Sequence, residues 1–317
     1  MSNPTENDMH QNRALTDVSI AYLQSEDKYI AGEVFGSTGV SQKTNVYHKY
    51  DKNDWLRNEV RTKSRGDDTP IGGYSTSTDT YKCITRWIGT DYYPEDLANA
   101  DEVFDVEADK ARWVAQQLLN QKEAEFASTF MTTSVWGTDS TPSTLWDNDA
   151  SDPKGDIITG SQVIEKNTGF MPNTLVVTRE IHDTFRQHPL ILDQHKYTSA
   201  DSITTDMIKR YFGVDRYFVM SAIKATNVEG GTATYDYVED ANALLCYVNP
   251  NGLSRQSVTA AHNFVWRGLT GLNNLGYVTD SYMDDSKEAT IIRGKMSYDM
   301  KVVASDLGYF FNAAITS

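Results

Sequence analysis

A segment of about thirty residues between two predicted β-strands is the feature that most constrains the fold. Before it, Val46, His48 and Tyr50 alternate with polar residues, and after it the run 81–88 is β-rich with the same period of two. The residues between them are DKNDWLRNEVRTKSRGDDTPIGGYSTSTDT, whose apolar pattern is too weak to form a core. Connections this long are uncommon inside a compact domain. We therefore expect a two-stranded projection, over 44–97, that lies on a neighbouring molecule.

The tip of this projection carries the residues expected to contact another subunit. Basic and acidic side chains alternate there, which makes a poor phosphate-binding patch but a reasonable half of an inter-subunit set of ion pairs. The candidates for this contact are Trp55, Arg57, Glu59, Arg61, Lys63, Arg65 and Tyr74. The alternative is a loop that is merely solvated.

A change of period after Asp105 predicts one long helix. Asp105 is a suitable N-cap, with Glu107 and Asp109 in the first turn near the positive end of the helix dipole. Apolar residues then recur at helical spacing at Ala111, Ala115, Leu119, Phe126 and Phe130, flanked by Val114 and Leu118. We expect Gly137 to end this helix, which at roughly thirty residues would span about 45 Å. Such a length indicates a structural spine.

The remaining elements favour an α+β fold. Residues 1–43 are polar with scattered apolar anchors and are predicted to form an arm with little core of its own. Helices are expected over 156–167, 179–187 and 203–212, and strands over 174–178, 216–220, 243–248, 264–266 and 289–303. Strands and helices are partly segregated, which argues against a doubly wound sheet.

Charge and composition exclude several classes of protein. The formal net charge is −15, from 44 acidic and 29 basic residues, so a sequence-reading nucleic-acid binder is not expected. An acidic wall that contains DNA without adhering to it fits this charge. No stretch approaches the roughly 20 apolar residues of a membrane span, and no secretory signal is present. Cys83 and Cys246 are expected to be buried thiols, consistent with synthesis in a reducing cytoplasm.

No catalytic motif emerges. The phosphate-binding pattern G-x-x-x-x-G-K-[ST], the dinucleotide pattern G-x-G-x-x-G and the nucleophile pattern G-x-S-x-G are all absent. His182, His188 and His195 are spaced six and seven apart with Pro189 between them, so we interpret them as structural or surface histidines, not metal ligands. No cofactor or metal site is expected.

Clusters of acidic residues leave two alternatives open. They are Asp67-Asp68, Asp284-Asp285 and the stretch 147–156, all in turn-like segments. Solvated turn acids are the favoured interpretation, and a calcium contact between subunits is the alternative. A hydrolase with an Asp/Glu pair also stays open, because such pairs come from distant positions in a sequence.

The order of the predicted elements resembles that of the major capsid proteins of tailed bacteriophages, which share the Hong Kong 97 fold. LTDVSIAYLQSEDKYIAGEVF (15–35) resembles the family's N-terminal arm, and YHKYDKNDWLRNE (47–59) with GGYSTSTDTYKC (72–83) resembles its extended E-loop. The run 98–136, with its leading N-A-D, resembles the spine-helix region. DPKGDIITGSQVIEKNTGFMPNTLVVTREIHDTFRQHP (152–189) resembles the peripheral domain. FVWRGLTG through MSYDMKVVASDLGYFFNAAI resembles the exit from the axial domain and the closing strands.

This resemblance implies an organisation and a function. It implies an arm over 1–43, an E-loop hairpin over 44–97, a peripheral domain with the spine helix over 98–198, an axial domain over 199–283, and closing strands over 284–317 that return to the peripheral domain. The implied function is structural and non-enzymatic: a homo-oligomer of hexamers and pentamers that forms the icosahedral head shell around double-stranded DNA.

Localisation and partners follow from the same resemblance. The protein would be made in the host bacterial cytoplasm and reside in the virion, without a membrane or a cofactor. Its partners would be the portal and possibly decoration proteins, and scaffolding would be a separate protein because the chain starts directly at the arm. Contact with the packaged DNA would be non-specific. The alternatives are an acidic β-rich hydrolase with an Asp/Glu pair, and a tail-tube or decoration protein.

Overall fold

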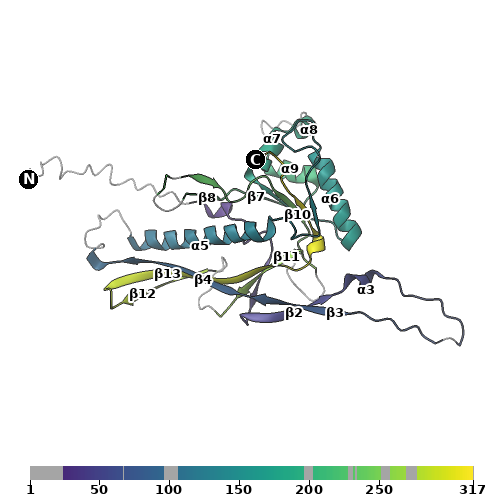
Figure 1. Cartoon of the computed structure of the whole chain (residues 1–317), viewed down its shortest axis with the longest axis horizontal. Coiled ribbons are helices and arrows are strands. Elements are labelled where there is room, and N and C mark those ends of the chain that lie inside the picture. The colour runs from purple at the N-terminus through teal and green to yellow at the C-terminus, as the bar shows by residue number, and fades with distance from the viewer. Residues whose placement is uncertain are drawn as a thin grey trace, which may run out of the picture.

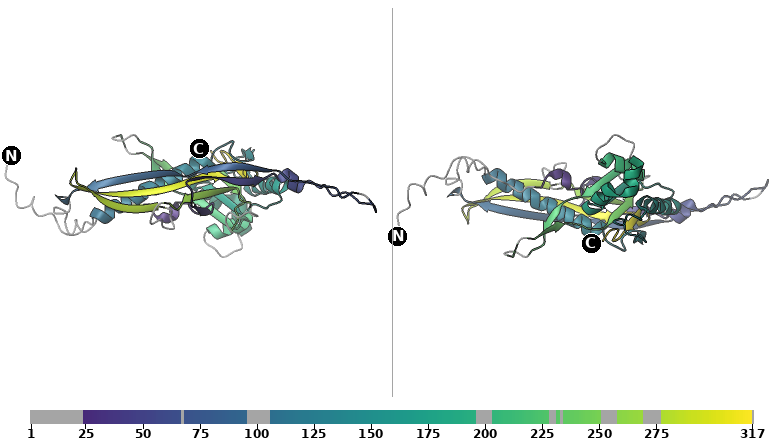
Figure 2. Two further views of the ribbon diagram at one scale, coloured as in Figure 1. Left: turned by 90° about the horizontal axis from the view of Figure 1, so that it is seen from below. Right: turned by 90° about the horizontal axis from the view of Figure 1, so that it is seen from above.

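Two five-stranded sheets organise the chain, and a hairpin extends away from them (Figure 1). The computed structural model describes residues 24–66, 68–95, 106–195, 203–227, 231–232, 234–250, 258–268 and 277–316. Figure 2 shows an elongated body whose long axis the hairpin continues. The mixed α+β fold class that the sequence predicted is confirmed.

The first sheet is built around β13 (Ala289–Val302), a strand of 14 residues. One end of β13 pairs with β11 (Ala261–Trp266), which in turn pairs in parallel with β1 (Ser37–Val40). The other end lies between β4 (Ile84–Tyr92) and β12 (Tyr277–Asp284). The strand β12 was not predicted, because its sequence YVTDSYMD is largely polar and the strand lies at an edge of the sheet.

The helix α5 (Val106–Phe130) lies along one face of this sheet (Figure 1). Val114 and Leu118 pack so closely over β13 that a Cβ atom at Gly294 would clash with both side chains. The most buried apolar positions of the helix are Val114, Leu118, Phe126 and Phe130, whereas Ala115 and Leu119 are only partly buried. The predicted apolar stripe therefore has the correct helical period. In the first half of the helix, however, the buried positions lie one residue before the predicted ones.

The helix is also shorter than predicted. It has 25 residues, or roughly 37 Å, and it ends at Phe130 instead of continuing to Gly137. The Trp136 indole donates a hydrogen bond to the Phe130 carbonyl (2.7 Å), and Ser134 adopts a positive φ of 66°. The chain thus turns back on the helix end and satisfies one of its free carbonyls. The predicted cap, Asp105, lies outside the described residues.

The second sheet has the strand order β5 (Thr138–Ser140), β14 (Gly308–Phe311), β10 (Ala243–Cys246), β6 (Thr174–Thr178) and β7 (Arg216–Met220). The strands β6, β10 and β14 are buried along their whole length, as expected of a sheet covered on both faces. Packed around it are α6 (Pro153–Thr168), α7 (Arg179–Gln187) and α9 (Thr205–Phe212). The short helix α8 (Pro189–His195), which was not predicted, lies beside α7 at the apex in Figure 1.

This second sheet joins segments that were expected to lie in separate domains. The strand β6 belongs to 98–198, β7 and β10 belong to 199–283, and β14 belongs to 284–317. The expected boundary at 198/199 therefore passes between β6 and β7, which are hydrogen-bonded neighbours. A single hydrophobic cluster also links both sheets, from Val34 through Leu175 to Phe311. Pairing between strands distant in sequence decides this arrangement, and periodicity carries no information about it.

The N-terminal segment from Tyr29 to Val40 belongs to the body, which corrects the arm predicted over 1–43. Tyr29, Ile30, Val34 and Phe35 are buried. The Phe35 ring lies 4.7 Å from that of Phe130 and is 1% exposed. Residues 1–23 lie outside the described part of the chain, so the prediction of an arm there stays a prediction.

The remaining elements are small. The strands β8 (Ile223–Ala225) and β9 (Tyr235–Tyr237) form a separate two-stranded ribbon. The 3-10 helices are η1 (Glu26–Lys28) and η2 (Ser305–Leu307). The extending hairpin consists of β2 (Thr44–Tyr50) and β3 (Thr76–Lys82), with α3 (Lys52–Leu56) between them.

Candidate inter-subunit interface

The projection expected from the sequence is present and leaves the body as a hairpin (Figure 1). The strand β2 pairs with β3 from Thr44↔Lys82 to Tyr50↔Thr76. The run 81–88, predicted as one return strand, is divided at Cys83: Tyr81 and Lys82 belong to the hairpin, whereas Ile84 begins β4 in the first sheet. We use "projection" below for residues 44–82.

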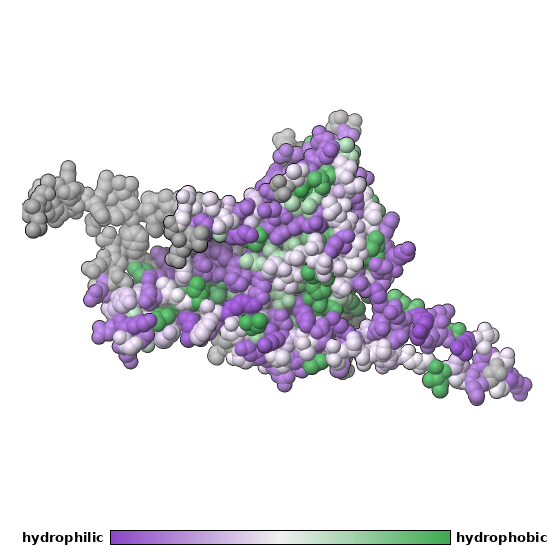
Figure 3. Space-filling model, in the orientation of Figure 1, coloured by the Kyte–Doolittle hydropathy of each residue, from purple (hydrophilic) through white to green (hydrophobic). Residues whose placement is uncertain are grey.

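Large apolar side chains of the projection remain exposed to solvent, between 48% and 97% of their surface. They are Val46, Tyr50, Trp55, Leu56, Val60, Ile71 and Tyr74. Figure 3 shows apolar residues along the projection among hydrophilic ones. Burying such a side chain fully is worth about 1.5–3 kcal/mol, and the described residues of this chain offer no core that covers them. The projection is therefore an apolar surface without a partner in its own subunit.

Three aromatic rings give the projection a preformed shape. The ring centroids of Tyr50 and Trp55 lie 6.0 Å apart, those of Tyr50 and Tyr74 lie 6.0 Å apart, and those of Trp55 and Tyr74 lie 5.7 Å apart. Trp55 and Tyr74 each stay 65% exposed, so they pack on one another and not in the core. The Asp54 carboxylate accepts hydrogen bonds from the Ser75 amide (2.7 Å) and hydroxyl (2.6 Å), which join the two limbs and lower the pKa of Asp54.

The charged candidates are exposed but differ in their partners. Arg57 pairs with Glu59 (2.6 Å) and more distantly with Asp54 (3.7 Å). Lys63 donates a hydrogen bond to the Thr69 hydroxyl (3.0 Å). Arg61 and Arg65 make no ion pair with any residue that the structure describes. These two guanidinium groups are thus free to accept a partner from elsewhere. That the seven candidates contact another subunit stays a prediction.

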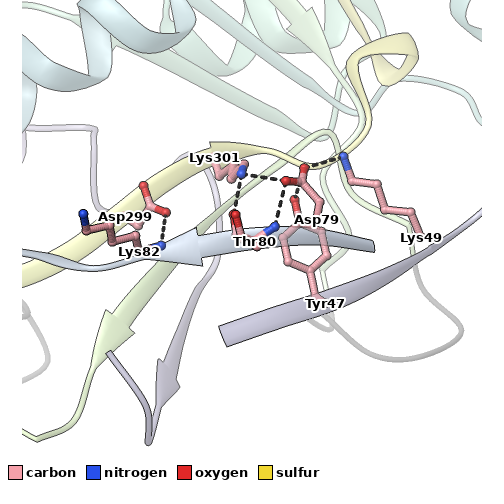
Figure 4. Close-up of polar contacts among 7 residues, drawn as sticks. All are labelled: Tyr47, Lys49, Asp79, Thr80, Lys82, Asp299 and Lys301. Carbon is pink, nitrogen blue, oxygen red and sulfur yellow. Dashed lines mark hydrogen bonds and ion pairs between the residues drawn. The ribbon is translucent and has the colours of Figure 1, made fainter. Parts of the chain in front are cut away.

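A polar cluster that the sequence did not indicate holds the root of the projection (Figure 4). The Asp79 carboxylate on β3 accepts hydrogen bonds from Lys301 (2.8 Å), Lys49 (2.9 Å) and the Tyr47 hydroxyl (3.0 Å). It also accepts one from the Thr80 amide (2.8 Å). Burial alone would raise the pKa of Asp79, but the hydrogen bonds from the two lysines and the other donors outweigh it and hold the pKa well below its usual value.

The strand β13 supplies the body side of this cluster. Lys301 also donates to the Thr80 carbonyl, and the Asp299 carboxylate accepts from the Lys82 amide (2.8 Å). Asp299 and Lys301 are two residues apart and therefore lie on the same face of the strand. On the opposite face, Tyr298 donates a hydrogen bond to Glu125 of α5 (2.6 Å). The projection and the long helix are thus fixed to opposite faces of one strand.

An aromatic contact completes the root. The Tyr81 ring stacks on Phe264 of β11 at 4.7 Å with an interplanar angle of 10°, and Tyr47 lies 5.7 Å from the same ring. The Cys83 thiol donates to the Phe264 carbonyl (3.4 Å) and is fully buried. Burial raises the pKa of Cys83 to about 11 and that of Cys246 to about 12, so both thiols stay protonated and unreactive at neutral pH.

The described residues offer little for acid–base or metal chemistry. No group of three or more His, Cys, Asp or Glu side chains that could hold a metal ion is found among them. His182 shares a hydrogen bond with the Tyr217 hydroxyl (3.0 Å) and His188 with that of Ser151 (3.0 Å), so both are structural as predicted. The side chain of His195 lies outside the described residues. The helix break predicted at Pro189 is confirmed, because α7 ends at Gln187 and α8 begins at Pro189.

One buried carboxyl has a pKa suited to proton transfer, but it is sealed. Burial raises the pKa of Glu123 to about 7. Its side chain is 0% exposed and accepts a hydrogen bond from the Ala31 amide (2.9 Å) beneath the N-terminal segment. A substrate has no access to this group, so it fixes the segment 29–35 on α5 and performs no catalysis.

A shallow hollow lies elsewhere on the surface, beside the C-terminal residues. Its lining residues are Ser143, Thr144, Leu145, Asp147, Asn148 and Thr316. It contains a single carboxylate, Asp147, whose pKa is lowered by a hydrogen bond from Thr316. An Asp/Glu pair of the kind that a hydrolase needs is therefore not assembled in this hollow. Within the described residues, no helix is both long and apolar enough to cross a membrane.

A curated phage protein is similar in sequence to part of this chain. Over 162 residues, 51% of this chain and 50% of the relative, the sequence is 26% identical to the major capsid protein of Burkholderia phage BcepMu. The chain thus spans about half the length of this curated relative. No family model matches the chain.

Solved structures match over almost the whole chain. A crystal structure of a phage-related protein from Bordetella bronchiseptica RB50 superposes with a TM-score of 0.70 at 20% identity, covering 93% of this chain and 95% of that one. The capsid structure of cyanophage P-SCSP1u gives a TM-score of 0.60 at 9% identity, covering 94% and 91%. An encapsulin complex from Synechococcus elongatus PCC 7942 gives 0.56 at 12% identity, covering 95% and 93%.

The chain has the Hong Kong 97-like capsid fold. The resemblance to the major capsid proteins of tailed phages, which the sequence indicated, is thereby confirmed.

Proposed function

We propose that this chain is the major capsid protein of a tailed phage, which assembles into the closed icosahedral head shell around a double-stranded DNA genome. The observation that carries the proposal is the projection: an ordered hairpin with exposed Trp55, Ile71 and Tyr74 and no core of its own. An enzyme would gain nothing from such an element, whereas a shell subunit uses it to bind the next copy. The curated relative, a phage major capsid protein, supports the same conclusion.

The shape of the subunit supports assembly through unlike surfaces. The projection leaves one end of the body, and the proposed contact joins it to the body of the next copy, so this contact is heterologous. Heterologous contacts close into rings when the rotation between subunits is correct. The closed rings that we propose are hexamers and pentamers, with the projection lying across the adjacent subunit. The region 199–283 would pack around the ring axis.

The long helix supports a non-specific contact with DNA. In its C-terminal half, the exposed positions Gln121, Ala124 and Ser128 are uncharged, and Lys122 is buried. Near its N-terminus, Arg112 is paired with Asp109 (3.1 Å). Together with the net charge of −15, these features favour a shell wall that encloses duplex DNA and binds few of its phosphate groups.

Partners and location follow from this function. The protein is made in the bacterial host cytoplasm and resides in the virion. Its principal partner is a second copy of itself, and the portal closes one vertex.

A second function, also that of a shell, is compatible with the same fold. The similarity to an encapsulin complex means that the fold alone fits either a phage head or a protein-enclosing compartment. The sequence similarity to a phage capsid protein favours the phage head. Particles from infected cells that contain DNA would support this choice, whereas particles filled with one host enzyme would overturn it.

The test of the proposal is the assembly state of the purified chain. A sizing column with negative-stain electron microscopy should show capsomers or closed shells. Tubes would indicate a tail-tube protein, and a stable monomer with hydrolytic activity would indicate an enzyme. A variant that lacks residues 51–75, with Tyr50 and Thr76 joined by a short turn, should remain folded and fail to form shells. It retains both sheets and loses five of the seven exposed apolar side chains of the projection.

A further inference from the structure

The direction of the projection depends on few contacts. Its two strands pair only with one another among the described strands, so no shared sheet continues from the body into the projection. Side chains at the root must therefore fix the angle between the projection and the body. Three groups of contacts are available there: the stack of Tyr81 on Phe264, the polar cluster around Asp79, and an ion pair between Lys52 and Asp306.

These three groups differ in what they can fix. A ring stack such as Tyr81 on Phe264 resists separation but permits rotation within the plane of the rings. The ion pair between Lys52 and Asp306 is solvated, with side chains 46% and 42% exposed, and such pairs contribute little. The Asp79 carboxylate is only 30% exposed and joins β2, through Lys49 and Tyr47, to β13 through Lys301. The rings of Tyr47 and Tyr81 also contact Phe264 of the body from both limbs. Of the three groups, however, the Asp79 cluster is the one that joins both limbs to the body through hydrogen bonds.

We propose that Asp79 is the positioning residue of the projection: it fixes the angle at which the hairpin leaves the body. When its bonds to Lys301 open, the hairpin turns about the Tyr81–Phe264 stack without unfolding. This inference rests on the proposed function, because the angle of the hairpin matters when the projection binds a neighbouring subunit. A fixed angle selects one position of the neighbouring subunit, and a released angle admits several.

The geometry predicts a measurable displacement. Thr62, near the tip, lies roughly 30 Å beyond the Asp79 cluster, from the rise of a few strand and helix residues. A swing of about 15° about the root would then move this position by about 8 Å. Both native cysteines are buried and protonated, so cysteines introduced at the exposed positions Thr62 and Lys166 can be spin-labelled selectively.

The experiment measures the distance between these two labels by double electron–electron resonance on isolated subunits. The doubly labelled parent should give one narrow distribution. Asp79→Asn should broaden or shift it by several ångströms, Lys301→Gln should do the same, and Lys301→Arg should restore the narrow distribution because it keeps the charge. Lys52→Gln should change little. The matched control is Asp280→Asn.

The Asp280→Asn control separates an effect on the position of the projection from an effect on the stability of the fold. It accepts hydrogen bonds from Arg293 (3.0 Å) and Lys295 (2.7 Å) on the same face of β13, which lower its pKa to about 2, yet it touches no part of the projection. Asp280→Asn should lower the thermal midpoint about as much as Asp79→Asn and leave the distance distribution unchanged. If folded Asp79→Asn and Lys301→Gln both retain the parental distribution, Asp79 does not position the projection. Should Asp79→Asn fail to fold, Lys301→Gln decides.

The outcome is independent of shell formation. An unchanged distribution would refute the role of Asp79 and leave the proposed function standing. Conversely, a parent that forms no capsomers or shells would refute the proposed function, while the distances in isolated subunits would still report on Asp79.

Discussion

Replacing Trp55 by alanine separates assembly from folding in this chain. The side chain is 65% exposed, so its removal leaves no cavity in the core. A tryptophan presents roughly 200 Å² of surface, of which about 130 Å² is free here. At about 25 cal/mol per Å², burying that area against a neighbour contributes about 3 kcal/mol. Each subunit contact should therefore weaken about 100-fold, since 1.4 kcal/mol corresponds to a factor of ten.

Trp146 is the matched control, because it is the same residue in the opposite environment. It is 0% exposed, its ring lies 5.0 Å from that of Phe311, and its indole donates to Asp156 (2.8 Å). Trp146→Ala should lower the free energy of unfolding by about 3–5 kcal/mol. Trp55→Ala should lower it by no more than the loss of ring contacts with Tyr50 and Tyr74, about 1 kcal/mol.

Two measurements decide this prediction. Chemical denaturation gives the free energy of unfolding, and light scattering against protein concentration gives the concentration at which shells form. Trp55→Ala should unfold near the wild-type midpoint and need a much higher concentration to assemble. Assembly at the wild-type concentration would refute the reasoning that exposed aromatic residues of the projection are contact residues.

Three further predictions follow from the described contacts. Leu118→Asp in α5 should abolish folding because it places an unpaired charge in the core, whereas Arg61→Ala should leave the circular dichroism spectrum unchanged and weaken assembly. Between pH 5 and 8, the free energy of unfolding of the wild type should fall relative to that of Glu123→Gln by at most about 3 kcal/mol. The pKa of Glu123 is raised to about 7 in the folded state, so its contribution to stability is lost as the pH rises through that value. Burial lowers the pKa of His262 to about 4 in both proteins, so the opposite pH dependence of that group cancels in this comparison by pH-dependent denaturation. In a mobility-shift assay at about 150 mM salt, the purified protein should bind duplex DNA negligibly, and sub-micromolar binding would contradict this.

Local signals in the sequence were sufficient for several elements. The helix α6 was predicted over 156–167 and closed by Gly169, and it does end at Gly169 with a φ of 79°. Its start was predicted three residues late, because the cap is Asp152, whose side chain accepts a hydrogen bond from the Gly155 amide (3.0 Å). The strand β6 could be predicted because its five residues are apolar or β-branched. All five are buried in the structure. The projection could be predicted because the segment between its two strands lacks an apolar pattern that could form a core. These features depend on residues that are close in sequence.

What could not be predicted depends on pairing between distant residues. The carboxylate of Asp79 meets Lys301 across 222 positions, and nothing near either residue marks them as partners. The burial of Phe35 likewise depends on Phe130, at the end of α5, and on Trp136, which reaches it only after the chain reverses at Ser134. The placement of β6 beside β7 is of the same kind. Register and strand order decide these contacts, and a single sequence does not contain them explicitly.

The parallel pairing of β1 with β11 also bears on the order in which the protein is made and folded. Ser37 is paired in register with Asn263. The strand β1, near the start of the chain, can therefore pair only after β11 has been synthesised, more than two hundred residues later. The strand β14 of the second sheet, which lies between β5 and β10, is later still. Contacts of such long range form slowly and only once most of the chain is available. A truncated translation product therefore lacks the strands that support the root of the projection, and only a finished chain can hold the projection at its final angle.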